Sequence, residues 1–385
     1  MTGTPPLADF PVAEFEARAE LAQRLMRAEG LDALFCTTEA EMRYFTGFRT
    51  LFWQSPTRPW FLVLPAEGAP VVVIPEIGAA LMRRTWVGDI RTWASPHPDD
   101  DGVSLLADVL RPYRMIGMPM GRESALRMPL VDFERVRAIC PALELRDASA
   151  LLQRIREVKS PAEIEKLEKI CAIGSRAFGA AGRLFHEGQT LAEAFRAFKI
   201  ELLQQGADDV PYLVGGAGPG GYADVISPPD AQELARGDVL MLDTGATLDG
   251  YFCDFDRNFA IGHAPDTAQR AHRTLFAAIE AALAVARPGA RCADLFGAIS
   301  GVIEGAGYGG GDVGRFGHGL GIQLTEAPSL TRFDQTELRV GMVLTLEPGL
   351  ELSAGKTMVH EENIVIEEGG ARLLTERTSP ELPVI

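Results

Sequence analysis

The stretch "GDVLMLDTG" (residues 237–245) returns 104 positions later as "GMVLTLEPG" (residues 341–349). Both follow the frame G-x-V-L-x-L-acid-x-G, in which an apolar run of strand length ends on a carboxylate. Each run is followed by a turn and a second strand-like stretch, so the pattern predicts two similar hairpins. Two related hairpins indicate a domain built from two related halves.

The first predicted hairpin is "VLMLDTGATLDGYFCDFDRNFAIG" (residues 239–262), and Asp249-Gly250 is a strong signal for its two-residue turn. With that turn, Asp243 faces Asp256 and Asp254 faces Gly245. Asp243 and Asp254 are then diagonal neighbours on one face, with Cα atoms about 7–8 Å apart. Two carboxylates at that spacing can share one cation or bridge two, and Gly245 would leave room for the ion.

The second predicted hairpin is "VLTLEPGLELSAGKTMVHEENIVIEEG" (residues 343–369). A turn centred on Ala354-Gly355 makes Glu347 face Glu362, and Pro348-Gly349 is a combination that can introduce a bulge into the strand. Each hairpin therefore offers a pair of acids on one face.

Between the hairpins, "RFGHGLGIQLTEAP" (residues 315–328) places His318 between two glycines. An isolated acid at a strand end is more often a turn or cap residue, but four clustered carboxylates would repel one another strongly if buried without a cation. One histidine and four carboxylates form a hard, oxygen-rich site that suits a pair of Mn²⁺, Fe²⁺ or Co²⁺ ions, with Zn²⁺ as another possibility. Paired ions of this kind activate a hydroxide held between them.

The chain of 385 residues is long enough for two domains. Its first part alternates helical and strand patterns, which predicts an α/β domain. Ser160, Pro161 and Glu163 then form the capping-box start of a long helix. We place the boundary just before this helix, which gives an α/β domain at residues 1–156 and an α+β catalytic domain at residues 157–385.

Composition indicates which classes of partner are excluded and in which cellular compartment the protein is expected. A net charge of −16 argues against a nucleic-acid or anionic-membrane partner, because either needs a basic surface. Five scattered cysteines are typical of reduced thiols, and we find neither a signal-peptide pattern nor a stretch of membrane-spanning length. These features predict a cytoplasmic protein.

The order of the candidate ligands resembles that of the metallohydrolase family of creatinase, prolidase, aminopeptidase P and methionine aminopeptidase. The matching stretches are "LDTGA", "CDFDRNFAIG", "GHGLG", "LEPGL" and "EENIVI", and "EAEMRYFTGF" and "REVKSPAEIEKL" extend the likeness into the first domain and the domain entry. The five residues that carry the resemblance are Asp243, Asp254, His318, Glu347 and Glu362.

The resemblance implies a pita-bread catalytic domain with pseudo-two-fold symmetry, preceded by a smaller creatinase-type N-terminal domain. It implies that Asp243 and Glu362 each touch one or both ions, that Asp254 and Glu347 bridge or flank them, and that His318 binds one. A metal-bound hydroxide would attack a peptide or amide carbonyl, with Glu347 carrying the proton. The resemblance also implies two divalent ions, commonly manganese, and a homodimer in which the N-terminal domain helps to close the neighbour's active site.

Two histidines that hold the substrate in proline-specific members are absent here, where Ile226 and Thr325 stand at or near their places. A threonine can form hydrogen bonds but does not titrate near neutral pH. Thr325 is therefore either a change that leaves peptidase activity to other groups or a sign of a different substrate. His360 is the nearest candidate for a replacement acid or base, with Asp256 behind it as a further substrate-site residue.

In the first domain, "FTGFRTLFWQSPTRPWF" (residues 45–61) contains Trp53 and Arg58. This segment is either an aromatic loop packed over a strand or a lid over the partner's active site, with Arg58 meeting a substrate carboxylate. "GGAGPGGY" (residues 215–222) lacks the Lys-Ser/Thr of a phosphate loop and is interpreted as a wall of the pocket.

We therefore predict a dinuclear metal-dependent hydrolase that resembles an Xaa-Pro dipeptidase or aminopeptidase and acts on a small peptide. The alternative is a metal-dependent hydrolase or lyase of a small non-peptide metabolite. A third possibility is a binding module that has kept the fold, although a pure binder has no need of a complete ligand set.

Overall fold

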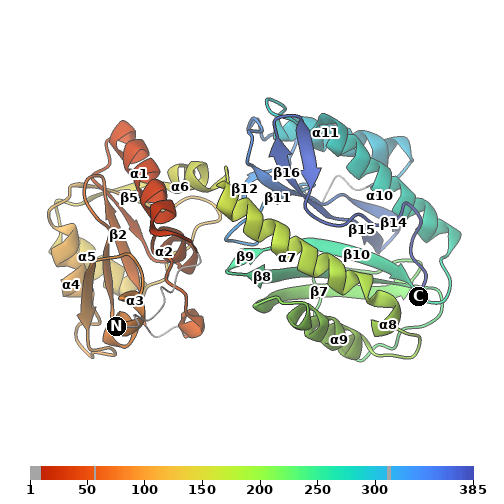
Figure 1. The fold of residues 1–385 in the computed structure, drawn as a ribbon, viewed down its shortest axis with the longest axis horizontal. Coiled ribbons are helices and arrows are strands. Elements are labelled where there is room, and N and C mark those ends of the chain that lie inside the picture. The colour runs from red at the N-terminus through yellow and green to blue at the C-terminus, as the bar shows by residue number, and fades with distance from the viewer. Residues whose placement is uncertain (1–9, 56–57, 310–313) are drawn as a thin grey trace. The chain divides into compact units, whose positions relative to one another are not determined.

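The computed structural model describes residues 10–55, 58–309 and 314–385. The chain divides into two compact units, residues 1–156 and residues 157–385 (Figure 1). Among the described residues, no helix combines the length and apolar character needed to cross a bilayer.

The N-terminal unit is built on a mixed six-stranded sheet with strand order β4-β3-β2-β1-β5-β6. β1 pairs antiparallel with β2 and β2 with β3, while the other pairings are parallel. Strands β2 and β3 are buried along their whole length because helices cover the sheet. Their side chains are accordingly apolar. The strands are β1 (Ala33–Cys36), β2 (Phe61–Pro65), β3 (Val71–Pro75), β4 (Asp89–Trp93), β5 (Met115–Met118) and β6 (Glu144–Asp147).

The helices of this unit form two groups. One consists of α1 (Val12–Glu29), α2 (Glu39–Thr46) and α6 (Ser149–Arg156), and the other of α4 (Val103–Leu110) and α5 (Leu130–Ile139). Three short elements complete the unit: the 3₁₀ turns η1 (Leu51–Gln54) and η2 (Glu76–Gly78), and α3 (Ala79–Met82).

The C-terminal unit begins as predicted, with α7 (Pro161–Gly179) starting at a capping box formed by Ser160 and Glu163. Its first half contains α8 (Ala181–Leu184), α9 (Leu191–Gln204) and a sheet of order β10-β8-β7. The strands are β7 (Asp209–Pro219), β8 (Asp238–Leu248) and β10 (Phe255–Ala260), and the short β9 (Tyr251–Phe252) pairs with β8.

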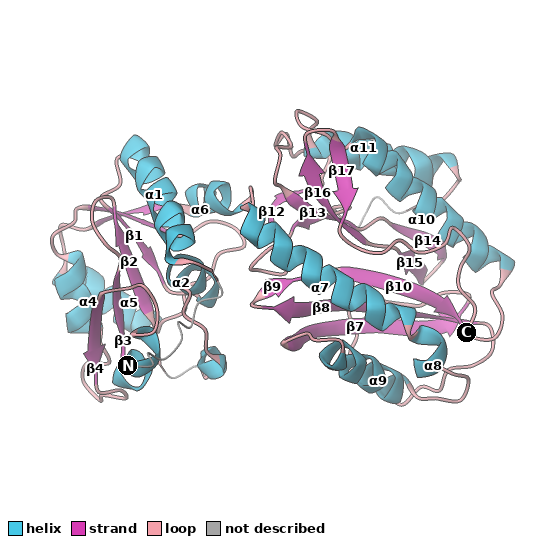
Figure 2. Cartoon of the chain, viewed as in Figure 1, coloured by secondary structure: helices cyan, strands magenta, loops and turns pink. Residues whose placement is uncertain are grey.

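The second half contains α10 (Asp266–Val285), α11 (Cys292–Gly305) and a sheet of order β12-β11-β13-β16-β17. In both halves, helices pack on a sheet that carries one copy of the repeated sequence, in β8 and in β13 (Figure 2). The strands are β11 (His318–Gly319), β12 (Glu326–Ser329), β13 (Val343–Leu346), β16 (Glu362–Glu367) and β17 (Gly370–Leu373), with β14 (Gly349–Ser353) and β15 (Lys356–Val359) paired separately.

The first hairpin has the predicted register, with Asp243 opposite Asp256. Its turn residues Asp249 and Gly250 both have positive φ, 51° and 76°, which is the conformation that a two-residue I′ turn requires. The expectation that Gly245 leaves room for an ion is wrong. A Cβ on Gly245 would lie 2.4 Å from Leu324 Cδ1, so this glycine admits a leucine side chain instead.

The second hairpin differs from the prediction by one residue. Its turn falls where expected, since Ser353 pairs with Lys356, but the register shifts between Glu351 and Ser353. This bulge lies at Leu352 rather than at Pro348-Gly349, and it carries through to β13 and β16, where Leu346 faces Glu362. A slip of one residue moves every later side chain to the other face, so Glu361 takes the position predicted for Glu362.

Candidate metal centre

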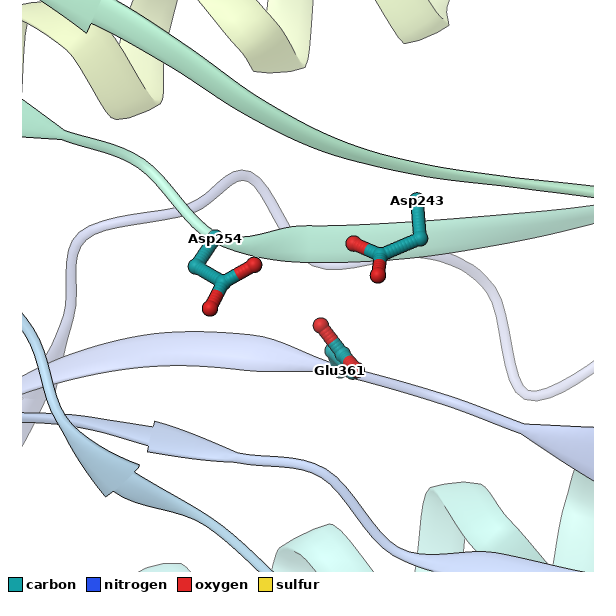
Figure 3. A group of neighbouring side chains, drawn as sticks. All are labelled: Asp243, Asp254 and Glu361. Carbon is teal, nitrogen blue, oxygen red and sulfur yellow. The ribbon is translucent and has the colours of Figure 1, made fainter. Parts of the chain in front are cut away.

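Three buried carboxylates from both halves of the C-terminal unit converge on one point. Single oxygen atoms of Asp243, Asp254 and Glu361 lie within 4.8 Å of one another, and the three side chains point toward a common centre (Figure 3). Asp243 belongs to β8, Asp254 directly precedes β10, and Glu361 directly precedes β16. The fold thus brings together acids that are more than a hundred residues apart in sequence.

His318 and Glu347 extend this group. His318 Nε2 lies 3.3 Å from Asp254 Oδ2 and 3.6 Å from Glu347 Oε2. The other ring nitrogen, Nδ1, lies 2.9 Å from the carbonyl oxygen of Gly319, which can only accept a hydrogen bond. Nδ1 therefore carries the hydrogen and Nε2 offers a lone pair to the cluster, which is the tautomer that a metal-binding histidine needs.

The glycine before the histidine is required by close packing. Gly317 has a φ of 143°, and a Cβ there would lie 2.2 Å from the carbonyl oxygen of Thr345. The next residue is fixed from the same side, because the His318 amide donates to Thr345 Oγ1 at 3.0 Å. The G-H-G motif thus presses the histidine against β13, the strand that leads to Glu347.

The electrostatics of the cluster call for cations. Burial raises the pKa of Asp254 to about 8, against the opposing effect of Arg315. Burial and then the repulsion of neighbouring carboxylates raise the pKa of Asp243 and of Glu361 well above their usual range. Within the described part of the chain, Asp243 Oδ1 and Glu361 Oε2 are buried without a hydrogen-bond partner. Divalent cations would supply these missing partners, so the donor set fits a metal centre.

Residues 165–368 match the metallopeptidase family M24, and residues 18–158 match the creatinase/prolidase N-terminal domain. The chain belongs to metallopeptidase family M24. It is 28% identical to a probable dipeptidase PepE of Mycobacterium tuberculosis over 94% of both chains. It is 25% identical to an Xaa-Pro dipeptidase of Pyrococcus furiosus, covering 95% of this chain and 99% of the relative.

A solved structure with the same architecture is dipeptidase PepE from Mycobacterium ulcerans, with a TM-score of 0.84 and 27% identity over 97% of this chain and 99% of that chain. The predicted family and its pita-bread fold with a creatinase-type N-terminal domain are thereby confirmed. M24 membership makes the chain a hydrolase that uses divalent metal ions, so the alternative of a non-enzymatic binding module is wrong.

Glu362, which we predicted as the fifth ligand, lies on the opposite side of its strand from the cluster of Asp243, Asp254 and Glu361. Its Oε2 lies 2.9 Å from Arg257 Nη2 and also accepts a hydrogen bond from Thr375 Oγ1. Although burial opposes ionisation, Arg257 lowers the pKa of this carboxyl. The bulge at Leu352 is the physical reason for the error.

His360 and Asp256, predicted near the substrate, have no exposed surface. His360 lies on the side of Glu362, with Nε2 3.5 Å from Glu362 Oε1, and its ring meets that of His272 at 5.5 Å. This placement argues against an acid–base role for His360. Asp256 lies beside Asp243 with Oδ1 accepting from Asn258 Nδ2 at 3.2 Å, which places it behind the cluster.

His272, on α10, belongs to the same buried region as His360. Burial lowers the pKa of His272 to about 4, and the neighbouring His360 and Arg257 act in the same direction. The carbonyl oxygen of Ser379, 3.1 Å from Nε2, and the carboxylate of Glu381 act against them. His272 is therefore a neutral, structural histidine.

Thr325 lies in a segment that is held against the cluster-bearing sheet. The preceding Leu324 fills the space above Gly245, and the following Glu326 forms a buried ion pair with Lys159, with Nζ and Oε2 3.1 Å apart. Thr325 is itself partly exposed. Its predicted role at the substrate stays a prediction, and Ile226, at the other histidine position, is 72% exposed.

Trp53 and Arg58 lie in the N-terminal unit. Their contacts are those of an aromatic loop packed within that unit. Trp53 is buried, with its ring centroid 5.8 Å from that of Trp60 and with the guanidinium of Arg127 at 4.8 Å. Arg58 stacks over Phe52 at 5.3 Å. Their contact with a substrate in a partner's active site stays a prediction.

Four residues that support the candidate metal centre were not predicted from the sequence. Glu361 was missed because of the register error. Arg315, which opens the quoted stretch of residues 315–328, has its Nε 3.5 Å from Glu347 Oε1. The Tyr212 hydroxyl donates to Asp243 Oδ2 at 3.0 Å, and Asn363 binds the main chain of Asp254. Arg315 and Asn363 could have been found from the quoted stretches "RFGHGLGIQLTEAP" and "EENIVI" that contain them, whereas Tyr212 sits in ordinary strand sequence.

Proposed function

We propose that this M24 hydrolase is a dinuclear metal-dependent dipeptidase that cleaves an amide bond in a small peptide, with an Xaa-Pro dipeptide as the first substrate to test. The observation that carries the proposal is the convergence of buried carboxylates, two of them with unpartnered oxygens, on a histidine whose Nε2 faces Asp254 and Glu347. The residues that would hold two ions, with Mn²⁺ the first choice, are Asp243, Asp254, His318, Glu347 and Glu361.

Bound at this centre, two divalent ions would supply Lewis acidity and would lower the pKa of a water, so that it could lose a proton and attack a carbonyl. The side chains of the cluster have distinct tasks. Glu347 keeps 19% of its side chain exposed, so it is the cluster acid best placed to hold a proton taken from the attacking water. Arg315 orients Glu347 from the outside, and Tyr212 fixes one oxygen of Asp243 so that the other faces the centre.

The proposal is tested by metal analysis and a dipeptide panel on the same preparation. We expect about two metal equivalents per chain, loss of activity on chelation, and recovery with Mn²⁺. Hydrolysis of Xaa-Pro dipeptides above that of other dipeptides would support the proposed substrate class. A chain that binds no divalent metal would rule the proposal out.

A second candidate function is hydrolysis or elimination on a small non-peptide metabolite. It is favoured by the absence of histidines at Thr325 and Ile226, because a hydroxyl can replace a hydrogen bond but not a titrating group. If metal binds and every dipeptide is inert, a screen of small amides becomes the deciding experiment. A Thr325→His variant that gains dipeptidase activity would show that the lost histidine determines the substrate.

The homodimer predicted from the resemblance belongs to the same proposal. It is supported only by the family likeness, and sedimentation of the metal-loaded protein tests it. A purely monomeric active enzyme would exclude a site completed by Trp53 or Arg58 of a second copy.

A further inference from the structure

The strands that bring Asp254 and Glu361 to the cluster belong to different sheets. In the described residues, no ladder of main-chain hydrogen bonds joins β10 to β16. The distance between these two acids therefore depends on side chains that reach across the gap. Besides Arg257, which donates to the carbonyl oxygen of Glu361 at 2.6 Å, two buried asparagines, one from each half, bind main-chain groups across it.

Asn363 binds the peptide groups of Asp254 on both sides. Its Nδ2 donates to the carbonyl oxygen of Asp254, and its Oδ1 accepts from the Asp254 amide at 3.0 Å. Oδ1 also lies 3.3 Å from the thiol sulfur of Cys171. Asn258 makes the corresponding contact from the first half, with Nδ2 donating to the carbonyl oxygen of Val359 at 2.7 Å.

These contacts obey the pseudo-two-fold relation of the repeat, whose spacing of 104 positions becomes 105 beyond the extra residue Leu352. Asn258 and Asn363 are 105 positions apart, and so are their targets Asp254 and Val359. The residues before the asparagines, Arg257 and Glu362, are also 105 positions apart, and they form the ion pair with Nη2 and Oε2 at 2.9 Å. We call the four residues Arg257, Asn258, Glu362 and Asn363 the crossed clasp.

The two asparagines of the crossed clasp bind residues with different roles. Asn258 binds Val359, whose side chain has no metal-binding atom, whereas Asn363 binds Asp254, a member of the carboxylate cluster. Asp254 lies just before β10 begins, so it lacks a ladder partner of its own in the described strands. An asparagine amide presents a donor and an acceptor side by side and can replace that missing partner.

We propose that Asn363 is a positioning residue of the metal centre: by holding the main chain of Asp254 it fixes that carboxylate beside His318 and Glu361. The inference rests on the proposed function, since it assumes that cations bind there. Residues that orient metal ligands commonly change metal affinity by about 10–100-fold when they are replaced. The expected effect is therefore on Mn²⁺ binding and not only on folding.

The test compares Asn363→Leu with the matched control Asn258→Leu. Each variant is stripped of metal, titrated with Mn²⁺ by calorimetry, and melted without metal. We expect Asn363→Leu to bind Mn²⁺ about 10–100-fold more weakly than the wild type, and Asn258→Leu to lose less than about tenfold while being destabilised to a similar degree. If Asn363→Leu does not fold, Asn363→Thr, which keeps one hydroxyl, is measured in its place and should be intermediate.

Unchanged Mn²⁺ affinity in the Asn363 variant would overturn the inference and leave the proposed function standing. Equal losses of affinity in both variants would also overturn it, because they would indicate general loosening of the two halves. Failure of the wild type itself to bind Mn²⁺ would refute the proposed function and the inference together.

Discussion

Replacing two adjacent glutamates one at a time tests the central geometric claim of the site. Glu361 faces the carboxylate cluster, whereas Glu362 faces Arg257 on the other side of the strand. Glu361→Gln and Glu362→Gln remove the same charge from neighbouring positions, so they are matched controls for each other. We expect the first to disable metal binding and the second to weaken the fold.

The two magnitudes follow from the contacts. Changes to residues that merely support a metal ligand cost about 10–100-fold in affinity, so loss of a charged ligand in Glu361→Gln should cost at least about 100-fold. Breaking a buried ion pair lowers the free energy of unfolding by about 3–5 kcal/mol, and we expect a loss of about 3 kcal/mol for Glu362→Gln. The lower end applies because Arg257 keeps three carbonyl acceptors, those of Asp256, Glu361 and Glu376.

The assay is Mn²⁺ titration of the chelated proteins together with thermal unfolding of the same samples. Three kcal/mol corresponds to a fall of about 6–12 °C in the midpoint for a unit of this size. Glu362→Gln should show that fall while its Mn²⁺ affinity changes by less than about tenfold. The reverse result, with metal lost from Glu362→Gln and retained by Glu361→Gln, would refute the register of β13 and β16 and the site built on it.

Three further predictions follow from other contacts. Tyr212→Phe should weaken Mn²⁺ binding about tenfold because Asp243 loses the hydrogen bond that orients its carboxylate. Tyr251→Phe loses a comparable hydrogen bond to Glu163 and should leave Mn²⁺ affinity unchanged, and calorimetric titration with Mn²⁺ compares the two variants. Lys159→Met should lower the free energy of unfolding, measured in urea, by about 3–5 kcal/mol because it removes the buried cation that pairs with Glu326, and adding Glu326→Gln should recover more than half of that. Burial lowers the pKa of His272 to about 4 in the fold, so its contribution to stability is complete above about pH 6.5 and is lost as the pH falls toward 4. Between about pH 7.5 and 4.5, the free energy of unfolding measured in urea should fall by about 2–3 kcal/mol more for the wild type than for His272→Asn.

Much of the architecture is predictable from local sequence. The capping box at Ser160 and Glu163 marks the start of α7 because its two hydrogen bonds depend on residues three positions apart. The Asp249-Gly250 turn fixes the first hairpin because a two-residue I′ turn admits one register only. In both cases the determining residues are neighbours in the chain.

The second hairpin shows where such prediction stops. The turn at Ala354-Gly355 was placed correctly, but the bulge at Leu352 carries no residue that marks it, since the strand "GLELS" is otherwise regular. One extra residue on one strand reverses the face of everything beyond it, so His360 and Glu362 were assigned to the wrong side and Glu361 was missed. Contacts such as that of Tyr212 with Asp243 depend on strand pairing between distant segments and leave no local pattern.

The repeat constrains the backbone more than it constrains the chemistry. Asp243 faces Asp256 in the first half, and extending the register in which Leu346 faces Glu362 makes Glu347 and Glu361 the corresponding pair in the second. Yet the three acids that converge are Asp243, Asp254 and Glu361, and the counterpart of Asp254 is Val359.

A ligand set that departs from the repeat has a physical advantage. If both halves contributed equivalent acids, the two ions would have identical surroundings and neither would be favoured for holding the substrate or the attacking water. In the proposed dinuclear centre, Val359 at one acid position and His318 in the second half would give the two ions different donors. The pseudo-two-fold relation can therefore place such a centre, but the residues that break it would decide what each ion does there.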